Sequence, residues 1–175
     1  MRPPNIGILL CGVLAILLFV CDAMLGRVCR WLRLLGYAAY YDPKGDDEYL
    51  LEKVVASRGI LLTRDLHLYR RALKHGVRAF YVEGTSFYEQ FWSVAREFKL
   101  RLEVDPRCSF CPKCGGKIRE AKGDEVAGII HPSTLERYGE FWVCTSCGKV
   151  YWKGAMWRSM NKVLEKIRSG VSLSR

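Results

Sequence analysis

Two short apolar runs in this 175-residue chain are each followed closely by an aspartate. The first run is Leu17 to Cys21, followed directly by Asp22, and the second is Ile60 to Thr63, with Asp65 two residues beyond. Runs of this kind are typical of strands that are buried on both faces of a parallel sheet. Because ligands of open α/β sheets bind beyond the carboxyl ends of the strands, both carboxylates are expected at a ligand-binding edge.

A further group of acids lies between these runs, at Asp46 and Asp47 with Glu48. Carboxylates that lie close together repel one another unless a cation neutralises them, and hard cations such as Mg²⁺ or Mn²⁺ take oxygen ligands. The pattern predicts that the two strand-end acids share a divalent metal with Asp46 or Asp47. The competing interpretation is that these acids only cap helices. It is weakest for Asp22, which directly follows an apolar strand.

Cysteine spacing predicts a second metal of a different kind. Five of the eight cysteines lie between residues 108 and 147, and they include two CxxC pairs that are each followed by glycine. The pairs are Cys111 with Cys114, and Cys144 with Cys147. Four thiolates at this spacing suit a structural, tetrahedral Zn²⁺ ion in a reducing, cytoplasmic compartment. Cys108 with Cys111 is the competing first pair.

Other side chains near these cysteines have two interpretations. His131 is interpreted as a loop residue and not as a zinc ligand. The aromatic residues around the cysteine pairs can stack nucleic-acid bases or can fill a small core. These aromatic residues are Phe141, Trp142, Tyr151, Trp152 and Trp157.

The remaining pattern predicts helices that alternate with strands. Helices are expected over residues 26–35, 47–57, 66–75, 86–98 and 156–168, and a further strand over 77–82. Residues 37–41 form either a short strand or a loop. This alternation predicts an α/β fold with a parallel sheet and right-handed crossovers.

The N-terminus and the net charge bear on partners. Ile6 to Cys21 is an uncharged apolar stretch, but a membrane span needs about 20 apolar residues and part of this stretch is needed for the first strand. Residues 1–16 are therefore interpreted as an apolar extension, with a membrane anchor as the alternative. The net charge of +10, which is concentrated in the C-terminal part, favours polyanions such as RNA.

Several segments together resemble one known family. They are Cys21 to Arg27, Arg30 to Gly36, Asp46 to Glu48, Leu61 to Asp65, Cys111 to Cys114, Phe141 to Cys144 and Val150 to Gly154. The resemblance is to the Mut-seven C-terminal domain family, whose members are PIN-like RNases with an appended zinc ribbon. It implies a PIN-like nuclease domain over residues 17–105 and a zinc ribbon with a basic C-terminal helix over residues 106–175.

The resemblance also implies an activity. It is that of a metal-dependent ribonuclease that hydrolyses RNA phosphodiester bonds, with Asp22 and Asp65 as strand-end acids and Asp47 or Asp46 as the helical acid. Glu83, after the strand at 77–82, is the candidate for a fourth acid.

Arginines near the expected edge can hold RNA phosphates. They are Arg27, Arg30 and Arg64, with Arg33 on the same helix. The alternative function is a non-catalytic zinc-ribbon protein that binds RNA, the ribosome or another ribonucleoprotein. A phosphatase is disfavoured, because the chain has neither a glycine-rich phosphate loop nor an Asp-x-Asp nucleophile pair.

Overall fold

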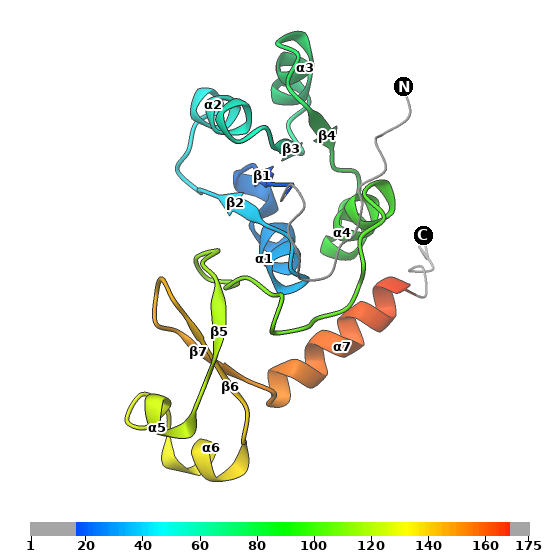
Figure 1. Cartoon of the computed structure of the whole chain (residues 1–175). Coiled ribbons are helices and arrows are strands. Elements are labelled where there is room, and N and C mark those ends of the chain that lie inside the picture. The colour runs from blue at the N-terminus through cyan, green and yellow to red at the C-terminus, as the bar shows by residue number, and fades with distance from the viewer. Residues whose placement is uncertain (1–16, 169–175) are drawn as a thin grey trace.

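The computed structural model describes residues 17–168, which form a parallel sheet covered by helices and a smaller antiparallel sheet (Figure 1). The parallel sheet has four strands in the order β2-β1-β3-β4. They are β1 (Phe19–Cys21), β2 (Ala39–Tyr41), β3 (Ile60–Thr63) and β4 (Ala79–Tyr81). The predicted α/β class is confirmed, and the segment that the sequence left between strand and loop is strand β2.

Helices cover both faces of this sheet. They are α1 (Gly26–Leu34), α2 (Asp47–Ser57), α3 (Leu66–Lys74) and α4 (Phe87–Glu97), with a 3-10 turn η1 (Ala23–Leu25) before α1. Phe19 and Cys21 of β1 pack on the side of α1 and α4, whereas Val20 packs on the side of α2 and α3. Both faces of the central strands are therefore buried, which explains their unbroken apolar sequence.

The C-terminal part forms the second sheet. Its antiparallel strands are β5 (Ile118–Ala121), β6 (Phe141–Cys144) and β7 (Val150–Trp152). The connection from β5 to β6 carries two short helices, α5 (Gly123–Val126) and α6 (Pro132–Arg137), where the sequence predicted only a hairpin-sized insert.

The last helix packs against the helices that cover the parallel sheet. It is α7 (Ala155–Arg168), and it packs beside α4 (Figure 1). Leu164 and Ile167 of α7 are buried in the same core as Phe91 and Val94 of α4. The two sheets are thus connected by packing as well as by the chain.

A buried arginine joins the two parts of the molecule. Arg33 is only 6 % exposed, so it does not lie on a solvated helix face, and its burial does not support the other interpretation, that it contacts phosphates. Its Nε donates to the carbonyl oxygen of Ala39 at 2.8 Å, and its Nη1 lies 3.5 Å from the carbonyl oxygens of Pro112 and Lys113. The backbone N–H of Phe110 in turn donates to the Arg33 carbonyl at 2.8 Å. These contacts hold the first cysteine loop against the end of α1.

The N-terminal extension predicted for residues 1–16 lies outside the described residues. Within residues 17–168, no helix has the length and apolar character that crossing a membrane requires.

Replacing Arg33 tests this junction. Arg33→Met is expected to lower the free energy of unfolding by about 2 kcal/mol, because it removes charge-assisted hydrogen bonds to buried carbonyls. Arg30→Met is the matched control, since Arg30 is exposed on the same helix and its loss is expected to change stability by about 0.5 kcal/mol or less. Urea denaturation followed by tryptophan fluorescence measures both variants, and equal losses would contradict the role given to Arg33.

Candidate active site and zinc centre

Asp22 is a buried carboxylate at the carboxyl end of β1. It is 5 % exposed, and three donors surround it. Its Oδ2 accepts from the Thr63 hydroxyl at 2.5 Å and from the Arg64 backbone N–H at 2.7 Å, and its Oδ1 accepts from the Met24 N–H at 2.9 Å. Hydrogen bonds of this number stabilise an ionised carboxylate away from water. They leave it lone-pair capacity for one further ligand.

Thr63 connects Asp22 to Asp65. Its hydroxyl oxygen accepts from the Asp65 backbone N–H at 2.9 Å while the hydroxyl donates to Asp22. Asp65 then caps α3, its Oδ1 accepting from the N–H groups of His67 at 2.7 Å and Leu68 at 3.1 Å. No hydrogen bond to the Asp65 Oδ2 atom is seen among residues 17–168. The two predicted strand-end acids therefore lie at one edge of the sheet and share a hydroxyl.

The acids at the start of α2 are not part of this hydrogen-bonded pair. Asp46 caps α2 by accepting from the Tyr49 N–H at 2.9 Å, and Asp47 is exposed in the first turn of α2. Glu48 forms an ion pair with Arg71 of α3. Within the described part of the chain, no hydrogen bond links Asp46 or Asp47 to Asp22, so the capping interpretation accounts for the contacts of Asp46.

An acid follows each strand of the parallel sheet: Asp42 is a position that the sequence did not place in the site, and Glu83 is the candidate that the resemblance suggested as a fourth acid. Asp42 directly follows β2, and the pairing of Cys21 with Tyr41 sets Asp42 beside Asp22 in register. Glu83 lies two residues beyond β4, next to the end of β3, where the Val82 N–H donates to the Thr63 carbonyl at 2.8 Å. Asp42 was missed because Asp-Pro-Lys-Gly also reads as a turn, and its Oδ1 does accept from the Lys44 N–H at 2.9 Å.

The acids have the right chemistry for a hard metal, but they are not drawn together tightly. In residues 17–168, the group of three or more potential ligands whose donor atoms lie within 4.8 Å of one another consists of cysteines, not of these acids. Mg²⁺ retains several waters and commonly uses one or two carboxylates together with substrate phosphates. Asp22 and Asp65, with Asp47 farther along the edge, are therefore residues that fit such an ion.

The arginines predicted to bind substrate lie around this edge in different environments. Arg27 is exposed, and its guanidinium carbon lies 4.0 Å from the centre of the Phe87 ring. Arg30 is exposed on the same helix. Arg64 is half-buried, its backbone N–H donates to Asp22, and its Nε is buried without a hydrogen-bond partner in the described structure. A buried donor without a hydrogen-bond partner destabilises the folded protein, and a hydrogen bond to a phosphate oxygen would remove this penalty.

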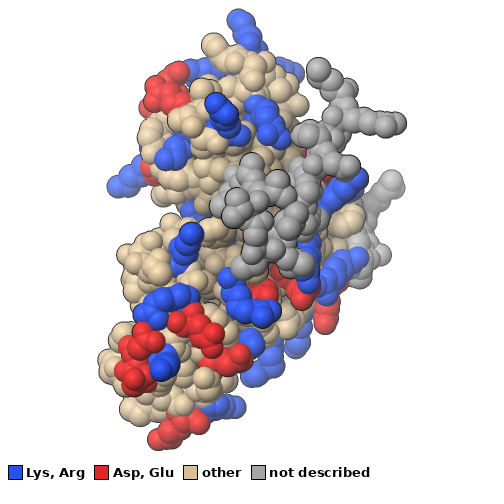
Figure 2. Space-filling view, viewed as in Figure 1, with Lys and Arg blue, Asp and Glu red and all other residues tan. Residues whose placement is uncertain are grey.

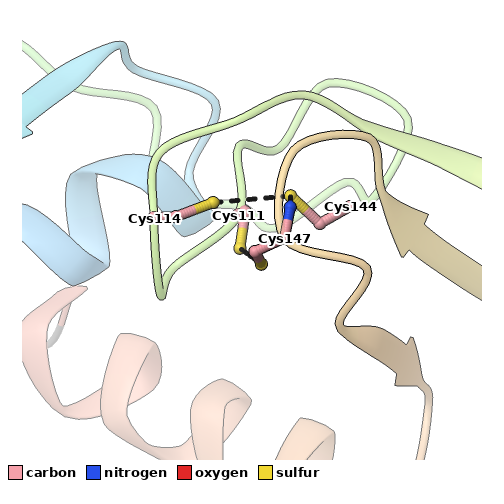
Figure 3. A group of neighbouring side chains, drawn as sticks. All are labelled: Cys111, Cys114, Cys144 and Cys147. Atoms are coloured by element: carbon pink, nitrogen blue, oxygen red, sulfur yellow. Dashed lines mark hydrogen bonds between the residues drawn. The ribbon is translucent and has the colours of Figure 1, made fainter.

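The two predicted cysteine pairs converge into one group of four side chains whose sulfur atoms could bind one zinc ion (Figure 3). The sulfurs of Cys111 and Cys147 are 3.7 Å apart, and those of Cys114 and Cys144 are 3.5 Å apart. A tetrahedral zinc ion with bonds of 2.3 Å places its sulfur ligands about 3.8 Å from one another. The four side chains therefore fit zinc, and Cys108, the first member of the competing pair, is not part of this group.

Hydrogen bonds prepare these thiols for a metal. The Tyr151 hydroxyl lies 3.1 Å from the Cys111 sulfur. Burial opposes ionisation of Cys111, but hydrogen bonds from Tyr151 and from backbone N–H groups of the cysteine loop outweigh it and lower its pKa to about 6. The N–H groups of Ser146 and Cys147 also point to the Cys144 sulfur, at 3.4 and 3.5 Å. Such bonds stabilise thiolates, the form that binds zinc.

The side chains around the zinc centre match the structural interpretation. The His131 ring accepts from the Ser133 N–H at the start of α6, as expected of a loop residue. Phe141 and Trp142 are buried, so they fill the small core and do not present a stacking surface. Trp152 is 36 % exposed and remains accessible.

Fold and site together define a two-part α/β protein whose second part carries four converging cysteines. Comparison with family models matches residues 18–164 to the Mut7-C RNAse domain, so the chain belongs to that family and to proteins of nuclease type. The resemblance seen in the sequence is thereby confirmed. No curated protein and no solved structure matched the chain.

Removing the shared hydroxyl tests the link between the two strand-end acids. Thr63→Val is expected to lower the free energy of unfolding by about 2 kcal/mol, since Asp22 loses a donor while it remains buried. Thr85→Val is the control, because the Thr85 hydroxyl is exposed and its partner Glu89 keeps two backbone donors. Chemical denaturation of both proteins at neutral pH measures the difference, and a Thr63 variant as stable as the control would refute the link.

Tyr151 tests the zinc centre. Tyr151→Phe is expected to weaken zinc binding by about 10- to 100-fold, because the hydroxyl that supports the Cys111 thiolate is lost. Competition with a chromophoric chelator measures this affinity. Tyr138→Phe is the comparison, since Tyr138 lies in the same sheet's core and not against a cysteine sulfur. Unchanged affinity of the Tyr151 variant would show that its hydroxyl does not support the metal.

Proposed function

We propose that this protein is a metal-dependent ribonuclease that hydrolyses phosphodiester bonds of RNA at the carboxyl edge of the parallel sheet. The supporting observation is the buried Asp22 carboxylate, which three donors hold at an edge where an acid follows each strand. Aspartates are rarely buried to this degree unless they are paired, and the donors of Asp22 leave its carboxylate free to accept one further ligand. Residues 17–105 would form the nuclease domain, and residues 106–175 the zinc ribbon with its basic helix.

Asp22 and Asp65, with Asp47 or Asp46 as a third acid, would hold one or two Mg²⁺ or Mn²⁺ ions. A bound ion of this kind supplies activation of water and neutralises charge that develops on the phosphate oxygens. The chain's own contribution is to fix the carboxylates. Thr63 orients Asp22 from β3, and the start of α3 orients Asp65 through two N–H groups.

The arginines would bind and orient the substrate. Among the described residues the Arg64 Nε has no hydrogen-bond acceptor, and a phosphate oxygen near Asp22 would accept its hydrogen bond. Arg27 and Arg30 lie on α1, which begins four residues after Asp22, and would contact neighbouring phosphates. Four thiolates bind zinc only while they stay reduced, which supports a cytoplasmic setting.

A specific observation favours the second candidate, a non-catalytic protein that binds RNA, the ribosome or another ribonucleoprotein. Asp46 and Asp65 both serve as helix caps, and the acids at the sheet edge do not converge within ligand distance in the described residues. In that case the wild-type protein would bind RNA without cutting it, and Asp22→Ala would leave RNA affinity unchanged or higher, since a negative charge is removed.

Neutral substitutions of the strand-end acids test the proposal. Asp22→Asn and Asp65→Asn are each expected to lower Mn²⁺-dependent cleavage of labelled single-stranded RNA by about 100-fold or more, since even indirect supports of a metal are worth 10- to 100-fold. Asp124→Asn, an exposed acid in α5, is the control for charge and should cleave like the wild type. Reactions with EDTA establish metal dependence, and circular dichroism confirms that each variant is folded. Full cleavage by both strand-end variants would exclude this active site.

A further inference from the structure

A row of cations runs along the exposed side of α7. Arg158, Lys162 and Lys166 are all exposed and are spaced four residues apart, so they lie above one another on the helix surface. The rise of an α-helix places the first and last of them about 12 Å apart along the axis. Leu164 and Ile167 anchor the other side of α7 in the core that α1 and α4 share. The direction of the row is therefore fixed relative to the parallel sheet.

A chain of ring contacts leads from this row to the candidate active site. The Lys166 ammonium lies 4.4 Å from the centre of the Tyr88 ring, and the Tyr88 and Phe87 ring centres are 5.5 Å apart. The Arg27 guanidinium carbon also lies near Phe87, 4.0 Å from the ring centre. Arg27 is in the first turn of α1, and the η1 turn before that helix is capped by Asp22.

Two acids lie near α7, and one of them, Glu165, is three residues from Lys162 and therefore next to the row on the helix surface. Glu165 lines a cavity together with Glu103 and Arg168, between α7 and the segment at residues 103–104. At the far end of the smaller sheet, the acids gather around α5 and α6, and Figure 2 shows them as a red patch at the lower left. A polyanion is therefore expected on α7 and not at that end of the sheet.

We propose that α7, Tyr88 and Arg27 form a binding track for single-stranded RNA that extends beyond the cleavage edge, an inference that rests on the proposed function. The three cations of α7 would neutralise successive phosphates. Tyr88 and the guanidinium plane of Arg27 would stack against bases. Bases of a single strand are free to stack in this way, whereas bases within a duplex are already paired and stacked.

The test measures RNA binding separately from cleavage. In the Asp22→Asn background, fluorescence anisotropy with a labelled single-stranded RNA is recorded over a range of salt concentrations. The triple variant Arg158→Gln, Lys162→Gln, Lys166→Gln is expected to reduce the slope of log affinity against log salt by about 2, since each phosphate contact of a single strand contributes about 0.7. In the cleaving protein, the same triple variant should raise KM and leave kcat close to that of the wild type.

Matched variants isolate the track from general charge. The triple variant Arg58→Gln, Lys74→Gln, Arg78→Gln removes the same charge from exposed residues at the opposite, amino edge of the parallel sheet, and it should keep the wild-type slope. Tyr88→Leu preserves all charge and is expected to weaken binding by about fivefold or more with an unchanged slope.

The outcomes separate this inference from the proposed function. If the α7 triple variant binds RNA like its amino-edge counterpart, the track is refuted even where the wild type cleaves RNA. If the wild type does not cleave but RNA binding still depends on α7 and Tyr88, the track stands and the proposed function fails. If the α7 variant loses only binding to phosphatidylserine vesicles and keeps RNA binding, the row serves a membrane surface and the proposal is overturned.

Discussion

The buried carboxylate of Asp22 is the constraint on which the arrangement of this sheet edge depends. Its three donors come from η1, from the side chain of Thr63 and from the backbone of Arg64, so its charge is supported only when β1 and β3 pair in their observed register. A slip of one residue would turn the Thr63 hydroxyl to the other face of the sheet and leave the charge short of a donor. The same hydroxyl accepts from the Asp65 N–H, so the start of α3 is positioned by the bond that stabilises Asp22.

Local patterns in the sequence predicted most of the elements because each has a local physical cause. Apolar runs identified β1 and β3, and Asp46 lies where the capping interpretation expected it, at the start of α2. The burial of Arg33 could not be predicted from the local sequence, because it depends on a cysteine loop far along the chain that packs on α1. Asp42 was missed for a related reason, since a turn and the edge of a sheet use the same residue types and only the pairing of β2 with β1 places it beside Asp22.

The two candidate metal sites differ in how far the chain assembles them. Four thiols converge to within 4.8 Å of one another, as direct bonds to one small ion require, and a bound zinc ion would neutralise the charge of their thiolates. Carboxylates are charged from the start, and their mutual repulsion opposes convergence. The fold accordingly secures Asp22 and Asp65 individually, each with its own N–H donors, and the proposed metal would be an ion that keeps part of its water.

The four-cysteine group is connected to the parallel sheet by packing contacts of the segments before and after it. Arg33 fixes the first cysteine loop against the C-terminal end of α1, and the N-terminal turn of the same helix carries Arg27. After β7 the chain returns through α7 to the core beside α4. The small sheet is therefore held at both of its ends against helices α1 and α4, which are the helices that flank the candidate active site. In the proposed RNA track its contribution would be to set the direction of α7 relative to Asp22, because a basic helix on a flexible tether would present the same charge without a fixed path to the carboxylates.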